Sequence, residues 1–219
     1  MRFEIRKTFF GRPTLLFLGL AIFCSQTVYA VNPANCIIDN RFGTKEYSIL
    51  KRACEYAVER IQSPAVRAKM DADSKFAMLS SQILNLSNVT NTSVSRWNLL
   101  WHQLYWLSQP NGRNDTEAPF PDVYINYAYE NAKWLGRAPL DTVIVYWNGT
   151  EWMQKGNFSI KINDYYVARD EKYSDPNEWA GTIAHEMAHN LGHDHPDSDD
   201  PNFYDYQINV LDEVVQNYR

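Results

Sequence analysis

The most informative stretch of the chain is DPNEWAGTIAHEMAHNLGHDH, residues 175–195. Asp175 is a suitable N-cap, Pro176 occupies the first helical position, and Glu178 completes a capping-box pattern. We therefore predict a helix that begins after Asp175 and ends near Gly192, a natural left-handed cap. Apolar residues at helical spacing form its packing face: Ala180, Ile183, Ala184, Met187, Ala188 and Leu191.

The histidines of this helix have the spacing of metal ligands. His185 and His189 are four residues apart, so their side chains project from one face, one turn from each other. A sharp turn at Gly192 would bring His195 back to this pair. His193 competes as the third ligand, because a continued helix would keep it near the first histidine.

Three neutral imidazoles on one Zn²⁺ leave the fourth tetrahedral position for water, which is the arrangement of a catalytic zinc site. Glu186 directly follows the first ligand. It would act as the general base toward that water and then pass the proton to a departing amine. The sequence therefore predicts one catalytic Zn²⁺ as the cofactor.

This segment resembles the zinc-binding consensus of the metzincin clan of metallopeptidases, His-Glu-x-x-His-x-x-Gly-x-x-His, at all five fixed positions. The resemblance covers about a dozen residues. It implies an α+β, zincin-like fold: a small, mostly antiparallel sheet packed on helices, with a short C-terminal subdomain after the active-site helix. It also implies a cleft across the zinc, an edge strand above it, and protein or peptide substrates. Its spacing favours His195 over His193 as the third ligand.

One metzincin feature is missing. Members of the clan carry a methionine turn after the third histidine, and no methionine follows Met187 in this chain. Residues 202–206 could take that place, with Tyr206 as a transition-state stabiliser beside the zinc. The alternative is that Tyr206 anchors the last helix.

The remaining elements are predicted from periodicity and turn signals. Helices are expected at 46–61, from Pro64 to about residue 84, and at 94–107. Residues 122–135 fit a strand or a helix. A hairpin with a two-residue type I′ turn at Asn148-Gly149 joins 143–147 to 150–154, and a third strand at 159–168 completes a small antiparallel meander. That third strand is either the edge strand of the cleft or an internal strand.

Residues 1–30 have the order of parts of a secretory signal peptide: a basic start, an apolar run at 15–24, and small residues before a cleavage site after Ala30. The alternative, an uncleaved anchor, is disfavoured because the run is too short for a membrane span. We expect a secreted, extracellular or periplasmic protein that stays out of the membrane after cleavage.

Removal of that segment takes away four basic residues and one acidic residue, which changes the net charge from −5 to −8. Such a surface repels phosphate backbones, so nucleic acid is not an expected partner. We expect a monomer whose partners are its substrates.

Two cysteines remain after cleavage. The simplest expectation is a Cys36–Cys54 disulfide in an oxidising compartment. The alternative is that one of them ligates the zinc as a latency switch.

The predicted domain organisation has three parts. They are the signal peptide at 1–30, a helical N-terminal region at 31–90, and a catalytic domain at 91–219. The middle part is either a propeptide or part of the catalytic domain.

The acidic residues after the metal motif form either a solvated loop or a calcium loop, and Asp194 or Asp197 could orient a histidine ring. The other acidic residues of this segment are Asp199 and Asp200. His102, on the third predicted helix, is expected to be structural.

The chain is thus predicted to be a secreted zinc-dependent endopeptidase. The alternative from another class is a secreted, zinc-stabilised binding or adhesion protein that uses the same fold without turnover. A third possibility is zinc-dependent hydrolysis of a non-peptide amide.

Overall fold

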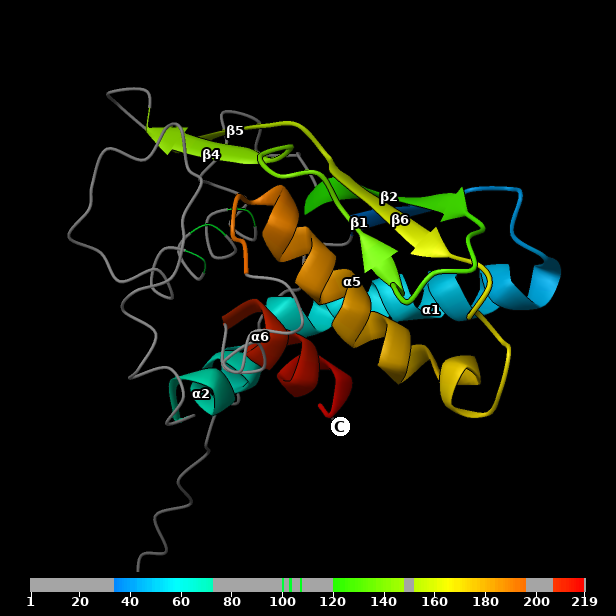
Figure 1. The fold of residues 1–219 in the computed structure, drawn as a ribbon. Coiled ribbons are helices and arrows are strands. Elements are labelled where there is room, and N and C mark those ends of the chain that lie inside the picture. The colour runs from blue at the N-terminus through cyan, green and yellow to red at the C-terminus, as the bar shows by residue number, and fades with distance from the viewer. Residues whose placement is uncertain are drawn as a thin grey trace, which may run out of the picture.

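The computed structural model describes residues 34–72, 100, 103, 107, 120–147, 152–195 and 207–218. A four-stranded sheet has the order β1-β2-β6-β3, and three helices lie along one side of it (Figure 1). The strands of this sheet are β1 (Ala34–Ile38), β2 (Phe120–Ala128), β6 (Phe158–Asn163) and β3 (Gly136–Arg137). The three helices are α1 (Thr44–Ile61), α5 (Pro176–Asn190) and α6 (Gln207–Gln216).

The smaller elements are the helix α2 (Pro64–Ala72), a 3₁₀ turn at Lys172–Ser174, and the strands β4 (Ile144–Trp147) and β5 (Trp152–Lys155). The predicted helix at 46–61 is confirmed, with α1 beginning two residues earlier than expected. Of the helix predicted from Pro64 to about residue 84, the part at 64–72 is confirmed as α2, and the rest lies outside the described residues. Of the predicted helix at 94–107, Leu100, Gln103 and Leu107 are described, and all three are helical. The predicted signal peptide at 1–30 lies outside the described residues.

The structure combines helices with a small sheet, as the predicted α+β class requires. The prediction that this sheet is mostly antiparallel is wrong. β1 pairs with β2 in parallel, β2 pairs with β6 in parallel, and β3 alone runs antiparallel to its neighbour. Long connections separate β1 from β2 and β2 from β6, and such connections allow strands to run in the same direction. Residues 122–135, which fitted either a strand or a helix, contain most of β2 and the loop that leads to β3.

The predicted hairpin exists, but its turn and its place in the fold differ from the prediction. β4 and β5 form a separate two-stranded sheet rather than a meander with the next strand. Trp147 pairs with Trp152, so four residues connect the strands instead of the two of a type I′ turn. At the other end, Gly156 has φ +93° and its Cα passes directly against the carbonyl of Thr142. This close crossing constrains the register independently of the local Asn-Gly signal.

The sheet and the helices share one hydrophobic core. Its largest fully buried side chains include Trp179, Phe120, Phe158 and Leu50, and the two phenylalanine rings stack with centroids 5.6 Å apart. Residues 34–72, whose role was open between a propeptide and the catalytic domain, contribute β1 and α1 to this same core. Burial of these apolar side chains is the main force that holds α1 against α5.

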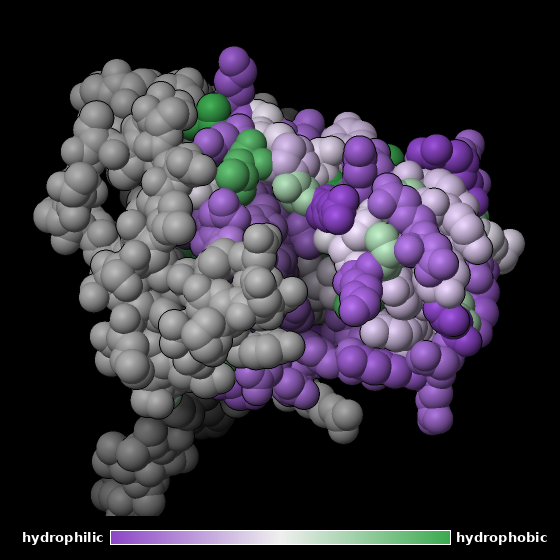
Figure 2. Space-filling view, in the orientation of Figure 1, coloured by the Kyte–Doolittle hydropathy of each residue, from purple (hydrophilic) through white to green (hydrophobic). Residues whose placement is uncertain are grey.

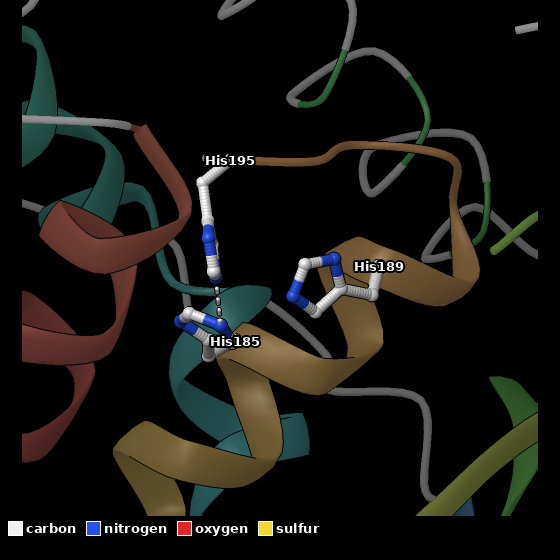
Figure 3. Close-up of side chains that lie close together, drawn as sticks. All are labelled: His185, His189 and His195. Atoms are coloured by element: carbon white, nitrogen blue, oxygen red, sulfur yellow. Dashed lines mark hydrogen bonds between the residues drawn. The ribbon is translucent and has the colours of Figure 1, made fainter. Parts of the chain in front are cut away.

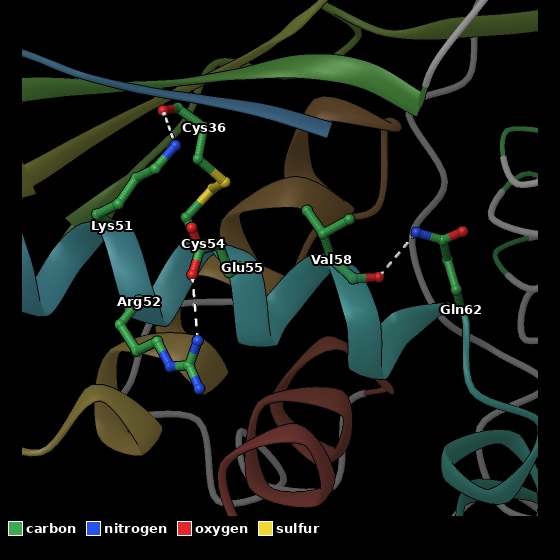
Figure 4. Close-up of a disulfide and its surroundings, with 7 residues drawn as sticks. All are labelled: Cys36, Lys51, Arg52, Cys54, Glu55, Val58 and Gln62. Atoms are coloured by element: carbon green, nitrogen blue, oxygen red, sulfur yellow. Dashed lines mark hydrogen bonds and ion pairs between the residues drawn. A yellow bond between two sulfur atoms is a disulfide. The ribbon is translucent and has the colours of Figure 1, made fainter. Parts of the chain in front are cut away.

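Two further links fix α1. The Cys36–Cys54 disulfide joins it to β1, and the Lys51 ammonium donates to the carbonyl of Cys36 at 3.0 Å (Figure 4). At its C-terminal end, the buried Arg60 guanidinium donates to the carbonyl of Val215 on α6 at 2.7 Å and to the Asn177 side chain on α5. The first helix is thereby tied to the sheet and to both other long helices.

Hydrophilic residues cover most of the described surface in the view of Figure 2. Among the described residues, no helix combines the length and the apolar character that a membrane span requires.

Candidate metal centre

The helix α5 begins as its sequence indicates, with one difference. The Asp175 carboxylate accepts a hydrogen bond from the Asn177 amide at 2.9 Å, and Pro176 fills the first turn. The reciprocal half of the capping box does not form, because the Asp175 amide donates to the carbonyl of Lys172. Glu178 instead forms an ion pair with the Lys172 ammonium at 3.5 Å. The backbone of the 3₁₀ turn, rather than the Glu178 side chain, is therefore the hydrogen-bond partner of the Asp175 amide.

The end of α5 confirms the predicted left-handed glycine. Gly192 has φ +88°. Its amide donates to the carbonyl of His189 at 2.8 Å, and the next amide, that of His193, donates to the carbonyl of Ala188 at 3.0 Å. This pair of bonds is a Schellman motif, which reverses the chain direction after a helix. The turn carries the following residues back toward the helix.

Three histidines meet at this turn (Figure 3). His185 and His189 come from α5, and His195 approaches from the segment after the turn, with ring centroids 4.9 to 5.1 Å apart. One nitrogen atom of each ring lies within 4.8 Å of the others, and the Nε2 atoms of His185 and His195 are 3.2 Å apart. Two ligands of a tetrahedral zinc ion lie about 3.3 Å apart when each Zn–N bond is about 2.0–2.1 Å. The three rings can therefore hold a metal ion after small side-chain adjustments.

The ring of His189 is oriented by a backbone group. Its Nδ1 lies 2.8 Å from the carbonyl oxygen of His193, to which a protonated Nδ1 donates, and this leaves Nε2 as the ligand atom. Asp194, which was expected to orient a ring, lies 3.9 Å from the same Nδ1 and accepts the amide of His195 at 2.9 Å. The carboxylate therefore stabilises the turn, while the His193 carbonyl orients the ligand.

The side chain of His193 is engaged elsewhere. It is buried, and its Nε2 lies 2.7 Å from the side-chain oxygen of Gln103, whose amide group donates to the carbonyl of Leu191. Gln103 comes from the distant 94–107 segment, so no local pattern could have revealed this contact. The structure places His195, rather than His193, beside the two helical histidines.

Burial keeps the helical imidazoles neutral. Desolvation lowers the pKa of His185 well below its ordinary value, and the neighbouring histidines lower it further, while the backbone of Ile208 opposes the shift. The buried Nδ1 of His185 has no partner of standard hydrogen-bond geometry among the described residues. Desolvation also lowers the pKa of His189. Neutral imidazole is the form that binds metals, so the environment favours ligation.

The side chain of Glu186 extends from α5 to Gly136 of β3. It is 5% exposed, and burial raises its pKa to about 8, with a smaller contribution from Asp212. A backbone hydrogen bond from Ala138 and the charge of Arg137 oppose this rise. Its Oε2 has no hydrogen-bond partner among the described residues. A buried carboxyl group with one unengaged oxygen can hold and release a proton.

Gly136 explains how the sheet edge comes so close to this carboxyl group. A Cβ at residue 136 would lie 2.9 Å from the Glu186 Cγ, 3.0 Å from its Oε1 and 3.0 Å from the Thr182 methyl group. Only a residue without a side chain allows this contact between strand and helix. The sequence analysis did not identify Gly136, because its partner is 50 positions away in the chain.

Residues 159–168 do not provide the sheet edge. The strand β6, in the first half of this segment, is internal, between β2 and β3. The edge strand next to the metal centre is β3, which has no described neighbour on its other side. Of the two interpretations of residues 159–168, an edge strand of the cleft or an internal strand, the internal strand is therefore the one that is confirmed.

Asn190 is a second residue that sequence reasoning missed. It is fully buried at the end of α5, and its side-chain oxygen accepts the Ser159 amide of β6 at 2.6 Å. Its side-chain amide donates to the carbonyls of Pro139 and Ser159, at 2.8 and 3.3 Å. This one side chain thus joins the metal-binding turn to the sheet and to the loop after β3. The sequence does not indicate this bridging role, because Asn190 lies between two candidate ligands, His189 and His195, without a recognisable pattern of its own.

Several predicted site residues lie outside the described residues. They are Tyr206, Asp197, Asp199, Asp200 and His102. Both cysteines are held in the disulfide, so neither is available as the thiolate of a latency switch.

No protein-family model matches the chain, no curated protein matches it, and no solved structure matches it. The geometry of the three histidines is therefore the evidence for the site.

Proposed function

We propose that this chain is a secreted zinc-dependent endopeptidase of metzincin type with a zincin-like fold. The observation that carries the proposal is the convergence of His185, His189 and His195, with Glu186 between the first two ligands in sequence. Three imidazoles also suit copper, iron or nickel. Zinc is proposed because this donor set lies beside a buried carboxyl group, the combination that hydrolytic zinc sites use.

A bound Zn²⁺ would act as a Lewis acid that polarises the scissile carbonyl and lowers the pKa of the attacking water. Glu186 would accept a proton from the attacking water at Oε2, which has no hydrogen-bond partner among the described residues, and would then donate it to the departing amine. The hydrogen bond from the Ala138 backbone holds the carboxyl group during both transfers. A dication beside Glu186 would lower its pKa from about 8, which favours the ionised form that acts as a base.

The edge strand β3 supports a peptide substrate. Because β3 has no described partner on its outer side, an extended peptide can add to it through backbone hydrogen bonds. Gly136 places this edge against Glu186, so a peptide bound there would pass close to the carboxyl group. Backbone pairing would hold many different sequences in the same position relative to the metal.

Export is part of the proposal. The signal-peptide pattern of residues 1–30 supports it, and the Cys36–Cys54 disulfide is compatible with an oxidising compartment.

The experiment is metal analysis combined with a peptide-cleavage assay on the wild type and Glu186→Gln. The wild type should contain one zinc ion and cleave peptides in a chelator-sensitive manner. Glu186→Gln should keep the zinc and lose about 10²- to 10⁴-fold in rate. Glu178→Gln is the matched control, because Glu178 is on the same helix and pairs with Lys172 away from the metal. Undiminished cleavage by Glu186→Gln would refute the assignment of the base.

The third ligand is tested in the same preparation. His195→Ala should lose zinc, while His193→Ala should retain it because that ring contacts Gln103. Zinc bound by a wild type that cleaves nothing would favour the alternative of a zinc-stabilised binding protein.

A further inference from the structure

The edge strand β3 carries a charge pattern that the proposed catalysis does not use. Gly136 faces α5, since a Cβ there would meet Glu186. Successive residues of a strand face opposite sides of the sheet, so Arg137 points to the side away from the helices. It is exposed and lies directly opposite Lys161 of β6, which is also exposed.

Two like charges in a directly opposed pair destabilise a sheet. Among the described residues, no ion pair involves Arg137 or Lys161. The chain as a whole carries a net charge of −5, so two adjacent cations at this edge depart from its general character. The positive charges of Arg137 and Lys161 would attract an anionic group that binds beside β3.

Arg137 is held in position. Its guanidinium lies over the Trp134 ring, 4.7 Å from the centroid, and the indole nitrogen of that ring donates to Glu130 at 3.0 Å. The loop that carries both residues is fixed by the buried Asn163, whose side-chain amide donates to the carbonyls of Glu130 and Trp134. A side chain ordered in this way loses little freedom when it pairs with a ligand.

A peptide that adds to β3 extends the same pattern by one strand. The peptide residue paired with Arg137 presents its side chain on the same face as Arg137 and Lys161. A carboxylate at that position would face an ordered cation that has no ion-pair partner among the described residues, and a lysine there would be a third cation beside Arg137 and Lys161.

We propose that Arg137, supported by Lys161, selects peptide substrates with an acidic residue at the position that pairs with Arg137. The inference rests on the proposed peptidase function and names its substrate class. Opposite-charge pairs between strands predict about a two- to fivefold preference for Glu over Gln at that position, and about tenfold for Glu over Lys.

The test is cleavage of a mixed peptide library by the zinc-loaded protein, with the products sequenced to give residue preferences around the scissile bond. The wild type should show acidic enrichment at one position. Arg137→Gln should lose that enrichment, and Arg137→Glu should shift it toward lysine. Arg169→Gln is the matched control, because Arg169 also stacks on an aromatic ring, that of Tyr165, but lies outside β3.

The outcomes separate the two proposals. Library cleavage with no acidic preference, or with the same preference in Arg137→Glu, overturns the inference and leaves the peptidase function standing. No chelator-sensitive cleavage of any peptide by the wild type overturns the peptidase function and the inference with it. Zinc content and thermal melting identify a variant that fails to fold, and Lys161→Gln, which should weaken the same preference, then provides the second test.

Discussion

The contact between β3 and the Glu186 carboxyl group, the proposed catalytic base, can be tested by a single added methyl group. In Gly136→Ala, the new Cβ would lie 2.9 Å from the Glu186 Cγ and 3.0 Å from the Thr182 methyl group. Favourable contacts between carbon atoms begin at about 3.5 Å, so the strand or the side chains must move by about 0.5–1 Å. Gly136 does not have a positive φ, so the change adds steric contact without backbone strain.

The added methyl group will displace the least rigid of the side chains that it contacts. Thr182 is β-branched and α5 is held by the core, so Glu186 is the side chain that can yield most easily. A displacement of about 1 Å at a catalytic group costs about 10²-fold in rate. The three histidines are not in this contact, so the zinc content should remain that of the wild type.

The assay is the cleavage rate at saturating peptide, measured together with zinc content and thermal melting. Gly43→Ala is the control, because the atoms nearest to its Cβ would be those of the Glu46 carboxyl group, the end of a flexible, partly exposed side chain. That variant should be close to the wild type in all three measurements. A Gly136→Ala protein with unchanged rate, zinc content and melting temperature would show that β3 does not position Glu186.

Three further predictions concern stability. Replacement of both Cys36 and Cys54 by serine should lower the free energy of unfolding by about 3 kcal/mol, because the disulfide closes a loop with a sequence separation of 18. Urea unfolding of the wild type with reductant should show the same loss. Equal stability of the wild type with and without reductant would contradict this prediction. Asn190→Ala leaves the part-buried Ser159 amide without its acceptor and should cost about 1–3 kcal/mol by the same measurement, so a neutral result would contradict its bridging role. Burial raises the pKa of the half-buried Asp212 from 3.8 to about 7, so its protonated form is favoured in the folded state and stability should fall as the pH rises from about 4 to 7. Asp212→Asn should remove the contribution of Asp212 to this pH dependence, and the variant should be about 2 kcal/mol more stable than the wild type at pH 8. This figure is smaller than the full pKa shift of Asp212 would give, because the side chain is partly solvated. Parallel profiles of stability against pH for the two proteins would count against the prediction.

Local signals in the sequence were sufficient for the metal-binding helix. The period of its apolar residues, the Asp175-Pro176 start and the Gly192 cap each act within a few residues, and the structure contains all three. The same locality placed His185 and His189 on one face. The disulfide was predictable because residues 31–219 contain two cysteines, which leaves one pairing.

The turn at Asn148-Gly149 and the capping box at Glu178 show the limit of local signals. Each pattern was present, and in each case a neighbouring contact prevailed: the strand register in the hairpin, and the 3₁₀ turn at Lys172 before the helix. Local preferences of this kind amount to about 1 kcal/mol or less, so tertiary contacts can override them.

The sequence by itself determined the helix, its two ends, the nitrogen donors and the disulfide, because these depend on residues a few positions apart or on a single possible pairing. Only the tertiary structure decided that the sheet is mainly parallel and that β3 is the edge next to Glu186. It also decided that the side chain of His193 turns to Gln103 while His195 joins the other two histidines. The contact of Gly136 with Glu186 joins segments 50 positions apart, and the contact of Gln103 with His193 joins segments 90 positions apart; the packing that brings such segments together leaves no pattern within any one of them.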